Sequence, residues 1–272
     1  MSARLEFTIL GCGSSGGVPR ADGEWGACDP SDARNRRSRC SLMVRRKAER
    51  DQQDETTILI DTSPDLRLQT AAAGAKRIDA VLYTHDHADQ AHGIDDLRAF
   101  FIRSRRRIPC FADPSTSATL RRRFDYVFES QSGYPAICDL SPLPDWGEAW
   151  SVDGPSGSIP VVGYDQDHGE VRAAGFRFGA VAYSPDVLNI PEESLAVLRG
   201  VEVFIVDALR DAPHPTHATV ARALEWIDEL KPRRAILTNM HIDLDFSALS
   251  ARLPPGVEPA YDGLRFEADT TD

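Results

Sequence analysis

The segment at residues 83–93 constrains this chain more than any other part of its sequence. It reads Tyr-Thr-His-Asp-His-Ala-Asp-Gln-Ala-His-Gly, and its three histidines follow directly on an expected strand at residues 80–84. Alternate side chains of an extended loop point the same way, so His85, His87 and Asp89 can face one centre. Two imidazoles and a carboxylate are ligands that zinc, iron and manganese accept. The segment therefore predicts a metal site.

Length, charge and hydropathy limit the class of protein. The chain has 272 residues, with 31 Lys+Arg against 42 Asp+Glu and a formal net charge of −11. This length suits one large α/β domain, and we expect a single domain over residues 1–272. No run approaches the roughly 18 apolar residues of a transmembrane helix. Residues 5–10 read as a strand rather than a signal peptide, so we expect neither a membrane association nor export.

The cysteine pattern favours the cytoplasm. The five cysteines are odd in number and form no C-x-x-C pair (Cys12, Cys28, Cys40, Cys110 and Cys138). A disulfide framework and a thiolate zinc site are therefore both disfavoured. We expect reduced thiols that act as small buried hydrophobic residues in a cytoplasmic protein.

Short apolar runs rich in β-branched residues predict a mixed α/β architecture. We expect strands at residues 5–10, 57–61, 80–84, 159–164, 175–183, 201–206 and 234–238. The apolar spacing of residues 94–101 predicts a helix that Pro109 closes. A second helix is expected to begin near residues 216–219 and to end at residue 230. Strands that are first paired and then alternate with helices indicate an α/β protein with mixed sheets.

The glycine-rich loop after the first expected strand does not predict a dinucleotide site. Gly11-Cys-Gly13-Ser-Ser-Gly16 fits the pattern G-x-G-x-x-G. That pattern binds a pyrophosphate only where its last glycine opens a helix, and here Pro19 and further loop residues follow instead. We expect the glycines to let this backbone pass close to another segment at the end of the strand.

Four residues outside the cluster are candidates to complete the metal site. Each follows an expected strand or lies near the start of an expected helix: His168, Asp186, His217 and His241. Taken singly, each could equally be a helix cap or a hydrogen-bonded surface residue. Taken with the cluster, they indicate one centre.

These motifs together resemble the metallo-β-lactamase superfamily of metal-dependent hydrolases. Its signature T-H-x-H-x-D-H is matched at residues 84–89 except for its last residue. Within the superfamily the chain is similar to the phosphoribosyl 1,2-cyclic phosphodiesterases and, more distantly, to the tRNA-trimming zinc endonucleases. The resemblance extends over nearly the whole chain. It implies an α/β fold in four layers, an αββα sandwich of two mixed β-sheets flanked by helices.

The resemblance also implies two divalent metal ions, zinc or else manganese or iron. His85, His87 and His168 would hold the first ion. Asp89 would bind the second ion, and Asp186 would bridge the two.

Two further residues match supporting positions of the family. Asp61 matches an aspartate that supports the metal loop from beneath. His217 matches a histidine that, in this branch, contacts the phosphate and assists proton transfer. Asp89 and His217 are accordingly the expected catalytic residues.

Two departures from the family affect the second metal site. Gln90 and Asn239 stand where the family has histidines that ligate the second ion. His241 lies two residues beyond Asn239, on the same side of an extended chain, and is the candidate replacement ligand. His92 is a less suitable substitute for Gln90. A glutamine carbonyl is a weaker and harder ligand than imidazole, so we expect a weak second site or one that favours manganese or iron.

The expected reaction is hydrolysis of a small or cyclic phosphodiester through a metal-bound hydroxide. The acidic charge disfavours long nucleic acid, because a basic face supplies most of that affinity, so a small phosphorylated substrate is expected. The basic clusters at residues 36–39, 103–107 and 121–123 are either solvated surface or the border of an anion pocket. Two alternatives stay open: a thioester or lactone hydrolase on the same centre, and a non-catalytic metal-binding accessory protein. A homodimer is also open, because the superfamily often forms dimers.

Overall fold

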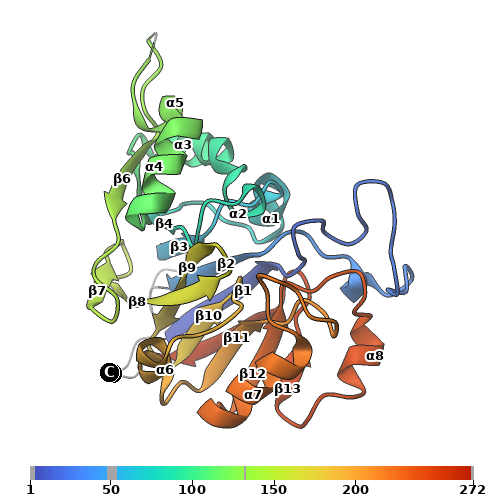
Figure 1. The fold of residues 1–272 in the computed structure, drawn as a ribbon. Coiled ribbons are helices and arrows are strands. Elements are labelled where there is room, and N and C mark those ends of the chain that lie inside the picture. The colour runs from blue at the N-terminus through green and yellow to red at the C-terminus, as the bar shows by residue number, and fades with distance from the viewer. Residues whose placement is uncertain (1–3, 48–53, 132, 271–272) are drawn as a thin grey trace.

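The chain forms two seven-stranded β-sheets in a computed structural model that describes residues 4–47, 54–131 and 133–270 (Figure 1). The first sheet has, in spatial order, β14 (Arg265–Asp269), β1 (Arg4–Gly11), β2 (Ser41–Lys47), β3 (Glu55–Ile60), β4 (Ala80–Leu82), β5 (Ile108–Ala112) and β6 (Cys138–Pro142). Its strands are antiparallel from β14 to β3 and parallel from β3 to β6. The first sheet is therefore mixed.

The second sheet repeats this plan. Its spatial order is β13 (Val257–Pro259), β12 (Arg234–Thr238), β11 (Val203–Asp207), β10 (Val181–Ser184), β9 (Val171–Phe178), β8 (Ile159–His168) and β7 (Ala149–Val152). Strands β13 to β10 are parallel, and strands β10 to β7 are antiparallel. Two mixed sheets confirm the predicted fold class.

Short helices connect the strands of each sheet. Those between strands of the first sheet are α1 (Leu66–Ala72), α2 (Ala88–Ala91), α3 (Arg98–Ser104), α4 (Pro114–Arg123), α5 (Asp125–Phe128) and the 3₁₀ helices η1 (Ala33–Asn35) and η2 (Ile94–Leu97). The later ones are α6 (Glu192–Leu198), α7 (Val220–Leu230) and α8 (Phe246–Ser250). Within the described residues, no helix has both the length and the apolarity that a membrane crossing requires.

Alternating side chains build two separate cores. Phe7 of β1 packs against Phe178 of β9 with ring centroids 6.1 Å apart, so one core lies between the sheets. Leu10 and Leu59 point to the other face of the first sheet, where they join helical residues such as Leu120 in the second core. Each fully buried apolar side chain of this kind contributes roughly 1.5–3 kcal/mol. The period of two along each strand thus produces the layered arrangement.

The structure corrects two expected elements. The run at residues 175–183 is not one strand but the hairpin of β9 and β10, because Gly179 turns the chain with φ +57°. The expected helix over residues 94–101 is η2 followed by α3, and it ends at Ser104. Arg105 ends it by adopting a left-handed conformation with φ +56°, and Pro109 lies in β5. Proline therefore did not mark this helix end.

The glycine loop passes close to another segment, as expected from its sequence. A Cβ atom on Gly11 would lie 2.1 Å from the carbonyl oxygen of Arg39. The amide of Gly13 donates to the carbonyl of Ser38 at 2.8 Å. The loop thus joins β1 to the segment before β2, and no helix opens after Gly16 in this described part of the chain.

Parallel strand ends gather the polar residues of interest at one edge. In the second sheet, Asp186 follows β10, Asp207 ends β11 and Asn239 follows β12. In the first sheet, Asp61 follows β3 and residues 84–87 follow β4. The carboxyl ends of neighbouring parallel strands lie at the same edge of a sheet, where ligand sites of α/β folds commonly form.

Candidate metal centre

Three histidines converge where β4 and β8 end. His85 and His87 lie in the loop between β4 and α2, and His168 is the last residue of β8. Their ring centroids lie 4.5, 4.9 and 5.1 Å apart, and one nitrogen of each lies within 4.8 Å of the others. Nitrogens this close can surround one metal ion, whose bonds to imidazole are about 2.0–2.1 Å long.

Hydrogen bonds on the far side of two rings prepare the ligand nitrogens. The Thr84 hydroxyl accepts from Nδ1 of His85 at 3.0 Å and donates to Oδ2 of Asp61 at 2.8 Å. Nδ1 of His168 donates to the carbonyl of Thr216 at 2.7 Å. With the proton on Nδ1, Nε2 of each ring presents a lone pair, and Nε2 of His85 is buried without a partner. Such bonds fix the tautomer of metal-binding histidines.

Asp61 supports the loop and does not reach the centre itself. Its second oxygen, Oδ1, accepts from the Thr84 amide at 2.8 Å. Its backbone is left-handed, with φ +62°, which is uncommon and strained for a residue other than glycine. Full burial raises the pKa of its carboxyl group well above the usual value. Asp61 therefore lies behind His85, linked to it through Thr84.

Burial keeps the two innermost histidines neutral. It lowers the pKa of His85 well below the usual value and that of His168 to about 3, and neighbouring imidazoles add to the effect. Neutral imidazole is the form that binds metal. Three close nitrogens, one of them buried and unpaired, fit a divalent ion such as zinc that accepts nitrogen ligands.

Asp186 lies on the other side of His168 and is held by two amides. Nε2 of Gln90 donates to its Oδ2 at 3.1 Å, and Nδ2 of Asn239 donates to its Oδ1 at 3.3 Å. Nδ1 of His217 lies 4.0 Å from Oδ1. Burial raises the pKa of the Asp186 carboxyl well above the usual value. The two residues that depart from the family signature thus meet on one carboxylate.

His217 forms a pair with Asp207. Nδ1 of His217 donates to Oδ2 of Asp207 at 2.8 Å, and the His217 ring lies 4.7 Å from the ring of His168. Burial alone would lower the pKa of His217, but the Asp207 carboxylate and the charge of Asp186 raise it to about 9. Asp207 was not among the residues predicted from the sequence, although it directly follows the expected strand at residues 201–206. That position is the same signal that selected Asp186.

Two predicted ligands lie outside these contacts. Asp89 is half-buried in α2, and its charge adds to the burial that raises the pKa of Asp186. Nε2 of His241 lies 2.5 Å from Nη2 of Arg20, and its Nδ1 lies 2.8 Å from Oδ2 of Asp243. Within the described residues, the close groups of potential ligands are His85, His87 and His168, and His168, Asp186 and His217. Asp89 and His241 belong to neither group.

A pocket of about 500 Å³ opens beside His87. Arg123 lines it, and its Nη1 donates to the carbonyl of Asp86 at 2.6 Å. His92 also lines it and packs edge-on against Phe124 with ring centroids 5.5 Å apart. One residue of the basic cluster at residues 121–123 therefore lines a pocket beside the metal centre. The pocket combines a cation with an aromatic ring, which suits an anionic substrate.

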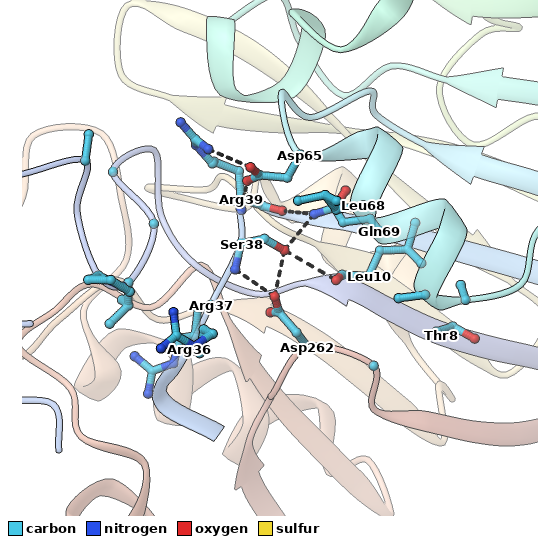
Figure 2. Close-up of a pocket in the computed structure, with 18 of the residues that line it drawn as sticks. Thr8, Leu10, Arg36, Arg37, Ser38, Arg39, Asp65, Leu68, Gln69 and Asp262 are labelled. Carbon is cyan, nitrogen blue, oxygen red and sulfur yellow. Dashed lines mark hydrogen bonds and ion pairs between the residues drawn. The ribbon is translucent and has the colours of Figure 1, made fainter. Parts of the chain in front are cut away.

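A larger pocket of about 530 Å³ lies apart from the histidines, between α1 and two loops (Figure 2). Arg39 pairs with Asp65 at 2.8 Å, and the Ser38 hydroxyl donates to Asp262 at 2.6 Å. Its described lining residues include no predicted ligand or catalytic residue, and both carboxylates already have partners. The basic cluster at residues 36–39 lines this pocket rather than the metal centre. We interpret the contacts of this cluster as stabilising the segment that leads into β2.

Comparison with known structures supports the fold described above. The structure of a diphosphatase from the PhnP family superposes with a TM-score of 0.85 at 34% identity, and 99% of each chain is covered. Zinc-bound PqqB from Methylobacterium extorquens gives 0.71 at 16% identity, over 96% of this chain and 99% of that chain. The short form of human tRNase Z gives 0.64 at 15% identity, over 96% and 98%. The last two likenesses concern the fold alone.

Comparison with sequences identifies the family. A curated relative from Porphyromonas gingivalis (strain ATCC BAA-308 / W83), named octanoyltransferase, is 30% identical over 268 residues. The match covers 96% of this chain and 51% of the relative, so the chain spans about half the length of that protein. A sequence model of the β-lactamase superfamily domain matches residues 56–242. The chain therefore belongs to the β-lactamase superfamily and has the metallo-β-lactamase fold.

Proposed function

We propose that this protein is a hydrolase and that it cleaves a small phosphodiester, linear or cyclic, with zinc or manganese bound to His85, His87 and His168. The observation that carries the proposal is the His217–Asp207 pair, whose imidazole lies 4.7 Å from the His168 ring. Cleavage of a phosphodiester expels an alcohol, which needs a proton as it leaves. A histidine held by a carboxylate beside the metal ligands is suited to that task.

Each residue of the centre has a separate role in the proposed reaction. A divalent ion on the three histidines would polarise a phosphoryl oxygen and lower the pKa of a water molecule. Asp207 accepts from Nδ1 of His217 and so leaves the Nε2 proton of the imidazolium for the departing oxygen. Arg123, in the pocket beside His87, is suited to bind a negatively charged group of the substrate through its guanidinium. These roles favour a small phosphorylated substrate over a neutral one.

Resemblance supports the same substrate class. The structure that superposes at 34% identity is described as a diphosphatase from the PhnP family. The formal net charge of −11 disfavours long nucleic acid as substrate, and a cytoplasmic location is part of the proposal.

A substrate panel tests the proposal. Protein loaded with zinc or manganese would be assayed with bis(4-nitrophenyl) phosphate, with a five-membered cyclic phosphodiester and with the octanoyl thioester of coenzyme A. We expect turnover of the phosphodiesters that disappears after metal removal and returns on reloading. Absence of phosphodiester turnover in metal-loaded, folded protein would contradict the proposal.

The thioester in that panel serves a second candidate function, hydrolysis of an acyl thioester at the same centre. The observation that favours it is the name of the curated relative, octanoyltransferase, because octanoyl transfer also acts on an acyl group. Only half of that relative corresponds to this chain. Faster turnover of the thioester than of either phosphodiester would replace the first candidate by the second.

A further inference from the structure

The hydrogen bonds of Asp186 oppose a second metal ion. A carboxylate that bridges two ions turns a lone pair of each oxygen towards an ion. Here Oδ2 accepts from Nε2 of Gln90 at 3.1 Å, and Oδ1 accepts from Nδ2 of Asn239 at 3.3 Å. Amide NH₂ groups are donors and offer a metal no lone pair, since the nitrogen is conjugated with the carbonyl. The side of the Asp186 carboxylate that faces Gln90 and Asn239 is thus occupied by amide N–H groups.

Four contacts surround the Asn239 amide. Besides Asp186, its Nδ2 donates to the carbonyl of Pro185 at 2.9 Å and lies 3.2 Å from Nδ1 of His217, and the thiol of Cys40 lies 3.7 Å from its Oδ1. Turning the amide over would set Oδ1 against the carbonyl of Pro185 and the carboxylate of Asp186. Asn239 also tolerates the left-handed backbone at this position, where φ is +59°. Its oxygen is therefore held away from Asp186.

The remaining atoms are too few to hold an ion on this side. Oε1 of Gln90 and Oδ1 of Asp207 are buried without a partner among the described residues, and the other oxygen of Asp207 already accepts from Nδ1 of His217. A bound zinc or manganese ion normally keeps at least three protein ligands.

The close group on this side among the described residues, His168, Asp186 and His217, shares the free nitrogen of His168 with the first ion. Asp89 and His241, which were expected to supply further ligands, belong to neither close group.

We propose that this centre binds a single divalent ion, on His85, His87 and His168, and that Gln90 and Asn239 replace the second ion. The inference rests on the metal site of the proposed function but not on its substrate. The two amides satisfy a carboxylate that is only 1% exposed and would otherwise lack partners. A substrate oxygen on this side would meet neutral N–H donors and His217 instead of a cation.

Metal stoichiometry in the wild type and in a double reversion tests the proposal. The variant Gln90→His with Asn239→His supplies two imidazoles where the amides now donate. Each protein would be saturated with Zn²⁺ or Mn²⁺, desalted and measured by plasma mass spectrometry. We expect one ion per chain in the wild type and two in the double variant. A matched control, Gln90→Ala with Asn239→Ala, removes the donors without adding ligands and is expected to stay at one.

Three outcomes would overturn the proposal. They are two ions in the wild type, no ion in the wild type, or one ion in a double variant that circular dichroism and thermal melting show to be folded. The readout does not depend on turnover. A wild type that binds one ion but cleaves no phosphodiester would contradict the proposed substrate and leave the single-ion centre standing.

Discussion

The centre has two halves that are built mostly from residues at or just after strand ends, yet their polar atoms are used differently. In the histidine half (His85, His87 and His168), Nε2 of His85 is buried without a partner. In the Asp186 half (Asp186, Gln90, Asn239 and His217), both carboxylate oxygens already accept hydrogen bonds. Buried polar atoms without partners are rare and need an explanation. The unpaired nitrogen supports a metal at the histidine half. The unpaired atom of the Asp186 half is Oε1 of Gln90, a weaker ligand than imidazole, and it lies beside a carboxylate that already accepts two hydrogen bonds.

The two halves also differ in charge. Burial lowers the pKa values of His85 and His168, so the histidine half is neutral before metal binds. The Asp186 half contains a pair, His217 and Asp207, in which the pKa of His217 is raised to about 9. One half is thus prepared to accept a cation, and the other carries an imidazolium of its own. Four predictions test this contrast.

The largest effect is expected from His168→Ala. It removes one of three ligands and the neighbour of His217, so metal content should fall close to zero and turnover should fall on the order of 10³-fold or more. Plasma mass spectrometry measures the metal content, and a steady-state assay measures the turnover. The control is His92→Ala, because His92 lies in the adjoining pocket but in neither group of close ligands. Retention of one tightly held ion in His168→Ala would contradict the assignment of the histidine half as the metal site.

His217→Ala should lower kcat by roughly 10²–10⁴-fold while leaving metal content unchanged. The reason is loss of the proton donor without loss of a ligand. Asp207→Asn should have a smaller effect in the same direction, because the imidazole remains but loses its charged partner. The comparison is made with metal-loaded proteins over a range of pH. Full turnover in His217→Ala would remove its role in proton transfer.

Arg123→Ala should raise KM for a phosphorylated substrate by about 10-fold, since a hydrogen bond to a charged group contributes roughly 1.5–3 kcal/mol. The measurement is KM and kcat on the cyclic phosphodiester, with metal content as a check on the loop that Arg123 contacts through Asp86. Arg122→Ala is the matched control, because Arg122 is the exposed neighbour outside the pocket. Equal KM values in the two variants would exclude Arg123 from substrate binding.

The smallest expected effect is the pH dependence of the free energy of unfolding of the metal-free protein. The folded state raises the pKa of His217 from 6.5 to about 9, so it holds that proton more tightly than the unfolded chain does. The resulting stabilisation is fully present below pH 6.5 and is lost as pH rises through 9, by at most about 3 kcal/mol. Urea unfolding at pH 6, 7.5 and 9 measures it. Asp207→Asn should flatten this dependence, and an unchanged slope would contradict the pairing.

Sequence alone predicted the fold and the local pattern of the histidine half. The alternation after β4 and the position of His168 at the end of a strand are short-range features, so they can be read along the chain. The hydrogen bond from Thr84 to Asp61 also joins residues that follow neighbouring parallel strands. The proximity of such residues can be predicted once the strand order is known.

The Asp186 half was harder to predict because its contacts join distant segments. Gln90 and Asn239 were seen as departures, but their shared contact with Asp186 depends on how the two sheets face each other. His241 was proposed from its spacing to Asn239, which assumed an extended chain. The backbone at Asn239 is left-handed instead, and His241 contacts Arg20 and Asp243. A single residue in that conformation redirects the next side chains.

The most direct test of the contrast between the halves is a crystal structure of the zinc-loaded protein with anomalous diffraction at the zinc edge. We expect one anomalous peak, bonded to His85, His87 and His168, with Gln90 and Asn239 still donating to Asp186. A second peak on the far side of Asp186, or a lone peak that His87 does not reach, would contradict it.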